Sequence, residues 1–190
     1  MSLDLARLNP PKGRPILRQK GVESRRNLVY NKEEKHVRLQ RHRAWERGER
    51  MKLLILDGQG GGIGKQLVSA VKAGMSGVEI TAVGTNVAAT TAMLKAGADK
   101  AATGENAVLV NCRRADVIVG PIGIVIADSL LGEITPAMAT AVAQSAAKRI
   151  LIPVNHCDTL VVGVQSLNTA GLIQDVLHEL IKLQSQQNEK

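Results

Sequence analysis

The chain has almost no aromatic side chains: its 190 residues include one Trp, one Tyr and no Phe. Those two residues, Tyr30 and Trp45, both precede Met51. The rest of the chain must therefore build its core from Ile, Leu, Val, Ala and Met. Because residues 51–190 contain no Phe, Tyr or Trp on which a base can stack, we expect no single-stranded nucleic-acid platform there.

Cysteine is equally scarce, and long apolar runs are absent from the sequence. Cys112 and Cys157 are the two cysteines, and their spacing matches no metal site and implies no disulfide framework. We therefore expect no metal. No apolar run reaches the roughly 18 residues that a membrane-spanning helix needs, and no apolar core of a secretory signal precedes Met51. These absences predict a cytoplasmic protein without a membrane partner.

The net charge is confined to the first 50 residues. Residues 1–50 hold 14 Lys and Arg against 6 Asp and Glu, a net charge of +8, whereas residues 51–190 hold 11 against 11. The first 30 residues have three prolines and no apolar periodicity, which predicts a largely disordered or helical basic extension. If the protein touches nucleic acid, we expect it to do so only through this extension. Whether residues 1–50 are expressed, or translation starts at Met51, stays open.

Residues 51–190 are predicted to form one α/β domain, doubly wound around a mostly parallel, Rossmann-like sheet of five to six strands. Short apolar runs alternate with helical patterns along this part of the chain. The expected strands are residues 53–56, 78–83, 100–102, 116–119 and 149–154, with 160–164 as a sixth. The expected helices are residues 66–72, 87–96, 105–113, 136–147 and 169–184. Residues 124–131 stay ambiguous, and the expected strand order is 3-2-1-4-5.

A glycine-rich turn follows the first expected strand and is the sharpest functional signal. Glycine lets a backbone approach a phosphate closely, and the N-terminus of the following helix adds N–H groups and the positive end of the helix dipole. We therefore predict a nucleotide-binding site here. A turn that only packs its helix on the strand is the alternative, as is another phosphate ligand. The predicted binding residues are Asp57, Gly58, Gly60, Gly61, Gly62, Ile63, Gly64 and Lys65.

The spacing of these glycines resembles two known turns. Residues 58–64 read G-x-x-x-G-I-G, which is similar to the turn of short-chain dehydrogenases, with Asp57 in place of their usual threonine. That resemblance implies NAD or NADP as cofactor. Their catalytic Tyr-x-x-x-Lys is not carried over, because residues 51–190 contain no tyrosine. Residues 61–65 also resemble the variant phosphate loop of ParA-like ATPases, which implies ATP as the alternative, but Gln66 replaces the magnesium-binding hydroxyl.

Two further turns follow expected strands at the same carboxyl edge, where open α/β sheets bind their ligands. We expect them to flank the nucleoside. The turn after the second strand has neither an acid nor an arginine to separate NAD from NADP. These turns are Gly84, Thr85 and Asn86, and Gly120, Pro121, Ile122 and Gly123; other pocket candidates are Thr103, Glu105, Asn106 and Asn155.

Several of these residues have a structural alternative. Thr85 and Thr103 each precede an expected helix and suit an N-cap. Thr135 followed by Pro136 predicts a helix start, and Gly97 a helix end. Polar residues in the apolar stretch before that start are candidate site or interface residues, namely Asp128, Ser129 and Glu133.

Candidate catalytic residues are few, and whether the protein is an enzyme stays open. His156 and Cys157, with Asp158, form the one cluster suited to acid–base or nucleophilic work. Adjacent side chains of an extended segment point in opposite directions, so a ready Cys–His pair is not implied. An exposed loop position is the alternative for His156.

Taken in order, residues 57–65, 84–86, 102–106 and 120–123 resemble an uncharacterised family of small Rossmann-like bacterial proteins, carried as a domain of unknown function. The resemblance covers residues 52–164 and implies a fold but no activity. We therefore expect a nucleotide-binding protein of unassigned activity. A noncatalytic sensor or scaffold, in which bound nucleotide sets a homo-oligomeric state, is the alternative from another class.

Overall fold

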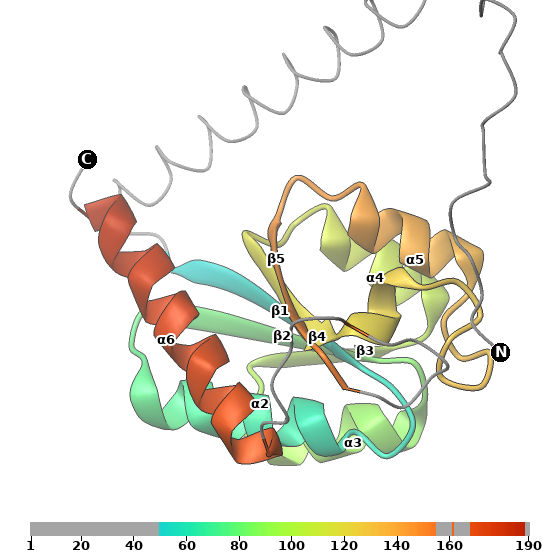
Figure 1. Ribbon diagram of the computed structural model, residues 1–190, viewed down its shortest axis with the longest axis horizontal. Coiled ribbons are helices and arrows are strands. Elements are labelled where there is room, and N and C mark those ends of the chain that lie inside the picture. Colours follow the sequence, from blue (N-terminus) through green and yellow to red (C-terminus); the bar gives the residue numbers. More distant parts are fainter. Residues whose placement is uncertain (1–49, 155–160, 162–167, 189–190) are drawn as a thin grey trace, which may run out of the picture. The chain divides into compact units, whose positions relative to one another are not determined.

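The computed structural model describes residues 50–154, 161 and 168–188, and these contain a five-stranded, all-parallel sheet (Figure 1). The strands lie in the order β3-β2-β1-β4-β5. Their bounds are β1 Met51–Asp57, β2 Val78–Gly84, β3 Lys100–Thr103, β4 Val117–Pro121 and β5 Lys148–Ile152. The predicted α/β class and strand order are confirmed. The predicted sixth strand falls, except for residue 161, outside the described residues.

Helices cover both faces of the sheet (Figure 1). One face carries α2 (Gly62–Gly74), α3 (Val87–Lys95) and α6 (Thr169–Asn188), and the other carries α4 (Glu105–Cys112) and α5 (Pro136–Ala143). The ambiguous segment begins in a short 3-10 helix, η1 (Ile122–Val125), and continues as an irregular loop. No helix of the described residues is long and apolar enough to cross a membrane.

Strand β1 lies at the centre of the sheet and buries side chains on both faces. Leu53 and Ile55 belong to the core beneath α2 and α6, whereas Leu54 and Leu56 belong to the core beneath α4 and α5. Each of the four is at most 1% exposed. A strand between two helical layers reads as a continuous apolar run, which is the pattern that predicted it. Its last residue, Asp57, therefore lies between the two layers at the carboxyl edge.

The helix termini confirm part of the predicted capping. The Thr135 hydroxyl accepts a hydrogen bond from the Met138 N–H at 3.2 Å, and Pro136 is the first helical residue of α5. Gly97 follows α3 with a left-handed φ of 107°, as expected of a helix end. These two local patterns depend on neighbouring residues only, which is why the sequence predicts them.

Two other predicted caps are wrong. Asn86, not Thr85, caps α3: its side-chain oxygen accepts a bond from the Ala89 N–H at 2.9 Å. Gly104, not Thr103, precedes α4 and makes no side-chain cap bond. Thr103 ends β3 instead. Both threonines lie one position too early, because each preceding strand continues one residue further than the apolar run alone suggests.

At Gly120, β4 has no room for a side chain beside β1. A Cβ at this position would lie 2.3 Å from the Leu56 carbonyl oxygen. A Cβ at Gly123 would lie 3.1 Å from the Ser129 hydroxyl, and Pro121 is buried. Both glycines of this turn therefore have a packing role. A ligand contact by residues 120–123 stays a prediction.

We expect Gly120→Ala to lower the free energy of unfolding by about 1–3 kcal/mol, because the added methyl group would overlap a backbone carbonyl that moves only with β1. Urea unfolding followed by circular dichroism measures this change. Gly60→Ala is the matched control, since a Cβ there would have no atom within 4 Å. Equal unfolding midpoints for the two variants would contradict the close approach of β4 to β1.

Candidate functional site

The carboxylate of Asp57 supports the glycine turn from inside the protein. One oxygen accepts a hydrogen bond from the Gly58 N–H at 2.8 Å, and the other accepts one from the Gly64 N–H at 2.6 Å. The Ile63 N–H bonds to the same carboxylate. Asp57 is only 5% exposed. It therefore satisfies N–H groups of the first turn of α2 and complements the helix dipole, as a capping residue does.

The environment of Asp57 raises its pKa. Burial is the largest cause, and the negative charge of Glu133 acts in the same direction. Hydrogen bonds from the N–H groups of Gly64, Gly58 and Ile63 oppose both effects without outweighing them. Asp57 thus takes up a proton more readily than an exposed aspartate does.

Three of the five glycines in the turn are required by packing. A Cβ at Gly58 would lie 2.8 Å from three side-chain atoms, and one at Gly64 would lie 2.4 Å from the sulfur of Met93. Gly61 has a left-handed φ of 67°, and a Cβ there would lie 2.6 Å from Cα of Ala89. These glycines let β1, α2 and α3 approach one another, so their presence needs no ligand to explain it.

Gly60 and Gly62 differ from the other three. Both are exposed, a Cβ at either would have no atom within 4 Å, and neither has a left-handed φ. Within the described part of the chain, the N–H group of neither glycine meets an acceptor. Packing within the protein therefore does not require glycine at either position. Glycine at these positions would allow a ligand to approach the backbone closely. Lys65, on the first turn of α2, is also exposed.

A second carboxylate, that of Glu133, ties the glycine turn to the end of β2. Its Oε2 accepts hydrogen bonds from the Gln59 N–H at 2.7 Å and from the Thr85 hydroxyl. Its Oε1 accepts one from the Asn86 side-chain amide at 3.1 Å. The same amide donates to the Gln59 carbonyl at 2.8 Å. One side chain thus holds two turns together at the carboxyl edge.

The loop that carries Glu133 has a strained backbone. Asp128, Leu130 and Leu131 have left-handed φ values of 62°, 55° and 59°, and Gly132 follows at 84°. Such values cost about 1–3 kcal/mol at a non-glycine residue unless neighbouring contacts enforce them. The Ser129 hydroxyl donates to the Gly123 carbonyl at 2.6 Å and helps to enforce them. Leu131, at the tip, is 96% exposed.

Sequence reasoning singled out Asp128, Ser129 and Glu133 but not their relation to the glycine turn. The contact from Gln59 to Glu133 spans 74 residues. No local pattern encodes such a contact, because it depends on how the loop after β4 crosses the sheet edge. The polarity of these residues in an apolar stretch was the one available signal.

The other predicted site residues do not all join this cluster. Thr103 is exposed, with its hydroxyl 2.8 Å from that of Thr90, and Glu105 accepts a bond from the Thr135 hydroxyl. Asn106 is exposed on the first turn of α4. A Cβ at Gly84 would lie 2.5 Å from the Thr90 backbone nitrogen, so packing requires that glycine. The predictions at Asn155, His156 and Cys157 lie outside the described residues.

A separate hollow of about 700 Å³ lies between α4 and α5, away from the glycine turn. Its lining is mainly aliphatic and includes Leu109, Ala141 and Cys112. Burial raises the pKa of the Cys112 thiol to about 11, so this thiol stays protonated and unreactive at neutral pH. Among the described residues, no group of three or more His, Cys, Asp and Glu is placed to hold a metal ion. The hollow thus supplies no evident chemistry.

Comparison with known proteins identifies the family. Residues 52–185 match the family model described as a domain of unknown function (DUF3842), so the chain belongs to that family. The match covers the sheet, the glycine turn and most of α6. No curated protein matches the chain.

We expect Glu133→Gln to lower the free energy of unfolding by about 1–3 kcal/mol, because an amide N–H₂ would face groups that now donate to a carboxylate. Glu105→Gln is the matched control, since Glu105 accepts a single bond, from Thr135. Thermal unfolding of both variants measures the difference. An equal loss of stability in both variants would contradict the conclusion that Glu133 contributes more to stability than Glu105 does.

The stability contributed by Glu133 should also depend on pH. Burial alone would raise its pKa, but hydrogen bonds from Gln59, Thr85 and Asn86 hold that pKa below the usual glutamate value of 4.5. A carboxylate whose pKa is lowered by folding stabilises the protein above its unfolded pKa, and this stability is lost as pH falls through the folded pKa. The difference between wild type and Glu133→Gln should therefore shrink in acid. A constant difference from neutral pH to about pH 3 would contradict this.

Proposed function

We propose that this member of the DUF3842 family binds a nucleotide at the carboxyl edge of its sheet. Its phosphate groups would accept hydrogen bonds from the N–H groups of Gly60 and Gly62 and a charge contact from Lys65. The observation that carries this proposal is a pair of exposed glycines that have no packing role and whose N–H groups meet no acceptor among the described residues. The positive end of the α2 dipole favours an anion at the same place.

The ligand that this edge suits best is a dinucleotide with a free ribose 2′-hydroxyl, which is NAD rather than NADP. In dinucleotide-binding domains an acid at the end of the second strand accepts bonds from the ribose. Here Glu133 brings a carboxylate to Thr85 and Asn86, at the end of β2. Within the described residues its Oε1 accepts bonds from Asn86 only, which leaves acceptor capacity for a hydroxyl.

The proposal concerns binding rather than a reaction. The described polar groups at this edge hold one another in place, and Asp57 and Glu133 both accept hydrogen bonds from the turn. Such an arrangement fixes the turn before a ligand arrives, which lowers the entropic cost of binding. Catalysis by His156 and Cys157 stays a prediction from the sequence.

Substitution of Gly60 or Gly62 should weaken NAD binding without destabilising the fold. NAD at about 100 times its Kd should stabilise the wild type by roughly 2.7 kcal/mol, a thermal shift of several degrees. Gly60→Ala and Gly62→Val should unfold like the wild type but lose at least about tenfold in affinity, because their side chains would occupy the place of the phosphate. Ser69→Ala, on the exposed side of α2, is the control. Unchanged NAD affinity in both glycine variants would contradict the assigned phosphate contacts.

The carboxylate of Glu133 should also make the protein prefer NAD to NADP. Repulsion between this charge and the 2′-phosphate of NADP would weaken the binding free energy by about 1–4 kcal/mol. We therefore expect the Kd for NADP, measured by titration calorimetry, to be at least about tenfold higher than that for NAD. Removing the charge in Glu133→Gln should narrow the ratio of the two Kd values. Equal binding of NAD and NADP to the wild type, or a preference for NADP, would contradict the role of Glu133.

A further inference from the structure

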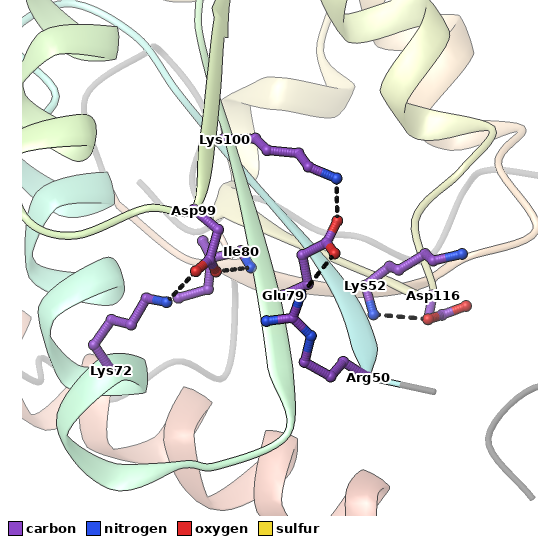
Figure 2. Close-up of polar contacts among 8 residues, drawn as sticks. All are labelled: Arg50, Lys52, Lys72, Glu79, Ile80, Asp99, Lys100 and Asp116. Carbon is purple, nitrogen blue, oxygen red and sulfur yellow. Dashed lines mark hydrogen bonds and ion pairs between the residues drawn. The ribbon is translucent and has the colours of Figure 1, made fainter. Parts of the chain in front are cut away.

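The amino edge of the sheet, at the opposite end of the strands from the glycine turn, carries a cluster of charged side chains (Figure 2). A cleft of about 360 Å³ lies there, between the starts of β1, β2 and β3 and the end of α4. Its polar lining comprises Lys52, Glu79, Thr81, Lys100, Asn111 and Arg114. Three of these six residues are cationic and one is anionic.

The one carboxylate in the cleft is already neutralised. Oε1 of Glu79 accepts a bond from the Lys100 ammonium at 2.6 Å, and Oε2 lies 3.4 Å from the Arg50 guanidinium. Figure 2 shows Glu79 between these two cations. The hydrogen bond from Lys100 is the main reason why the pKa of Glu79 is lowered, so the ion pairs persist at neutral pH. Glu79 thus forms ion pairs with Lys100 and Arg50 but with neither Lys52 nor Arg114, although the charge of Lys52 also helps to lower the pKa of Glu79.

Lys52 and Arg114 are the other two cations of the cleft. The backbone N–H of Lys52 donates to Asp116 at 2.8 Å, but its side-chain ammonium has no partner among the described residues. Arg114 uses its backbone N–H to bond to the Asn111 carbonyl at 3.0 Å, and its guanidinium likewise has no partner in the described part of the chain. Both side chains line the cleft. Two cationic side chains thus line the same cleft.

Uncharged donors and acceptors line the same space. No described residue bonds to the Thr81 hydroxyl, and the Asn111 side-chain oxygen is also without a described partner, because its bond to Ala107 uses the amide nitrogen. No buried side-chain polar atom among the described residues lacks a partner, so these groups face solvent in the cleft. A tetrahedral anion accepts many hydrogen bonds and suits such a mixed set of donors.

We infer that this cleft is a second ligand site, which binds the phosphate group of a small phosphorylated molecule through Arg114, Lys52 and Thr81. A phosphate monoester carries up to two negative charges at neutral pH, which suit the side chains of Lys52 and Arg114, since neither forms an ion pair with a described residue. The volume lies at the lower end of small-molecule sites. A nucleic acid would need a far larger basic surface, of at least about 600 Å². The inference does not depend on nucleotide binding at the glycine turn.

The test uses the 190-residue chain with Gly62→Val, so that phosphate bound at the glycine turn does not contribute. Glycerol 3-phosphate, malonate and a single-stranded oligonucleotide are titrated by calorimetry. We expect glycerol 3-phosphate to bind more tightly than malonate, and Arg114→Gln and Lys52→Gln each to weaken it by at least about tenfold. Lys148→Gln removes an exposed cation at the same edge but outside the cleft. This control should change the Kd by less than about twofold.

Four results would overturn the inference. If glycerol 3-phosphate does not bind, the cleft is not a phosphate site. If malonate binds more tightly than glycerol 3-phosphate, the cleft is a carboxylate site instead. An equal loss of affinity for glycerol 3-phosphate in Lys148→Gln and Arg114→Gln would show that binding depends only on the overall positive charge of this edge. Binding of the oligonucleotide without glycerol 3-phosphate would assign the surface to nucleic acid. Selective loss in the two cleft variants, with both folded by circular dichroism, would establish it.

Discussion

The buried carboxylate of Asp57 is the interaction on which the carboxyl edge depends. It ends the central strand and accepts hydrogen bonds from the N–H groups of Gly58, Ile63 and Gly64. Without it, these inward N–H groups would lack partners, which costs free energy in a buried site. The N–H groups of the exposed Gly60 and Gly62 meet no acceptor among the described residues, so these are the groups that the proposed ligand would use. The buried Asp57 carboxylate thus determines which N–H groups of the turn a ligand could use.

Glu133 extends this arrangement across the sheet edge. It connects a strained loop after β4 to the glycine turn and to the end of β2. The left-handed backbone of Leu130 and Leu131 is unfavourable locally, and the contacts of the loop offset that cost. The result is an acid at the end of β2 that the strand itself does not carry. Rigidity of the turn and the chemistry of the proposed nucleoside site therefore come from the same side chain.

Much of this fold follows from the sequence, whereas the site follows only in part. The apolar run of β1 and the alternation of strands with helices are local patterns, and they predict the elements. The strand order then follows from the doubly wound arrangement of such α/β chains. No local sequence pattern predicts the left-handed backbone of Asp128 and Leu130. The hydrogen bond from Gln59 to Glu133 joins segments that are 74 residues apart in the sequence. The two cations of the amino-edge cleft are similarly scattered. Lys52 lies near the start of β1 and Arg114 follows α4, and only the folded sheet brings them together.

Amide NMR of the isotope-labelled chain during titration with NAD tests the central claim most directly, because it reports on individual N–H groups. We predict that the amide resonances of Gly60 and Gly62 shift most, with smaller changes at Gly58 and Gly64, whose N–H groups stay bonded to Asp57. The same titration should leave the chemical shifts of the amides near Arg114 unchanged. No change at Gly60 and Gly62 at saturating NAD, or changes confined to the amino edge, would contradict the account.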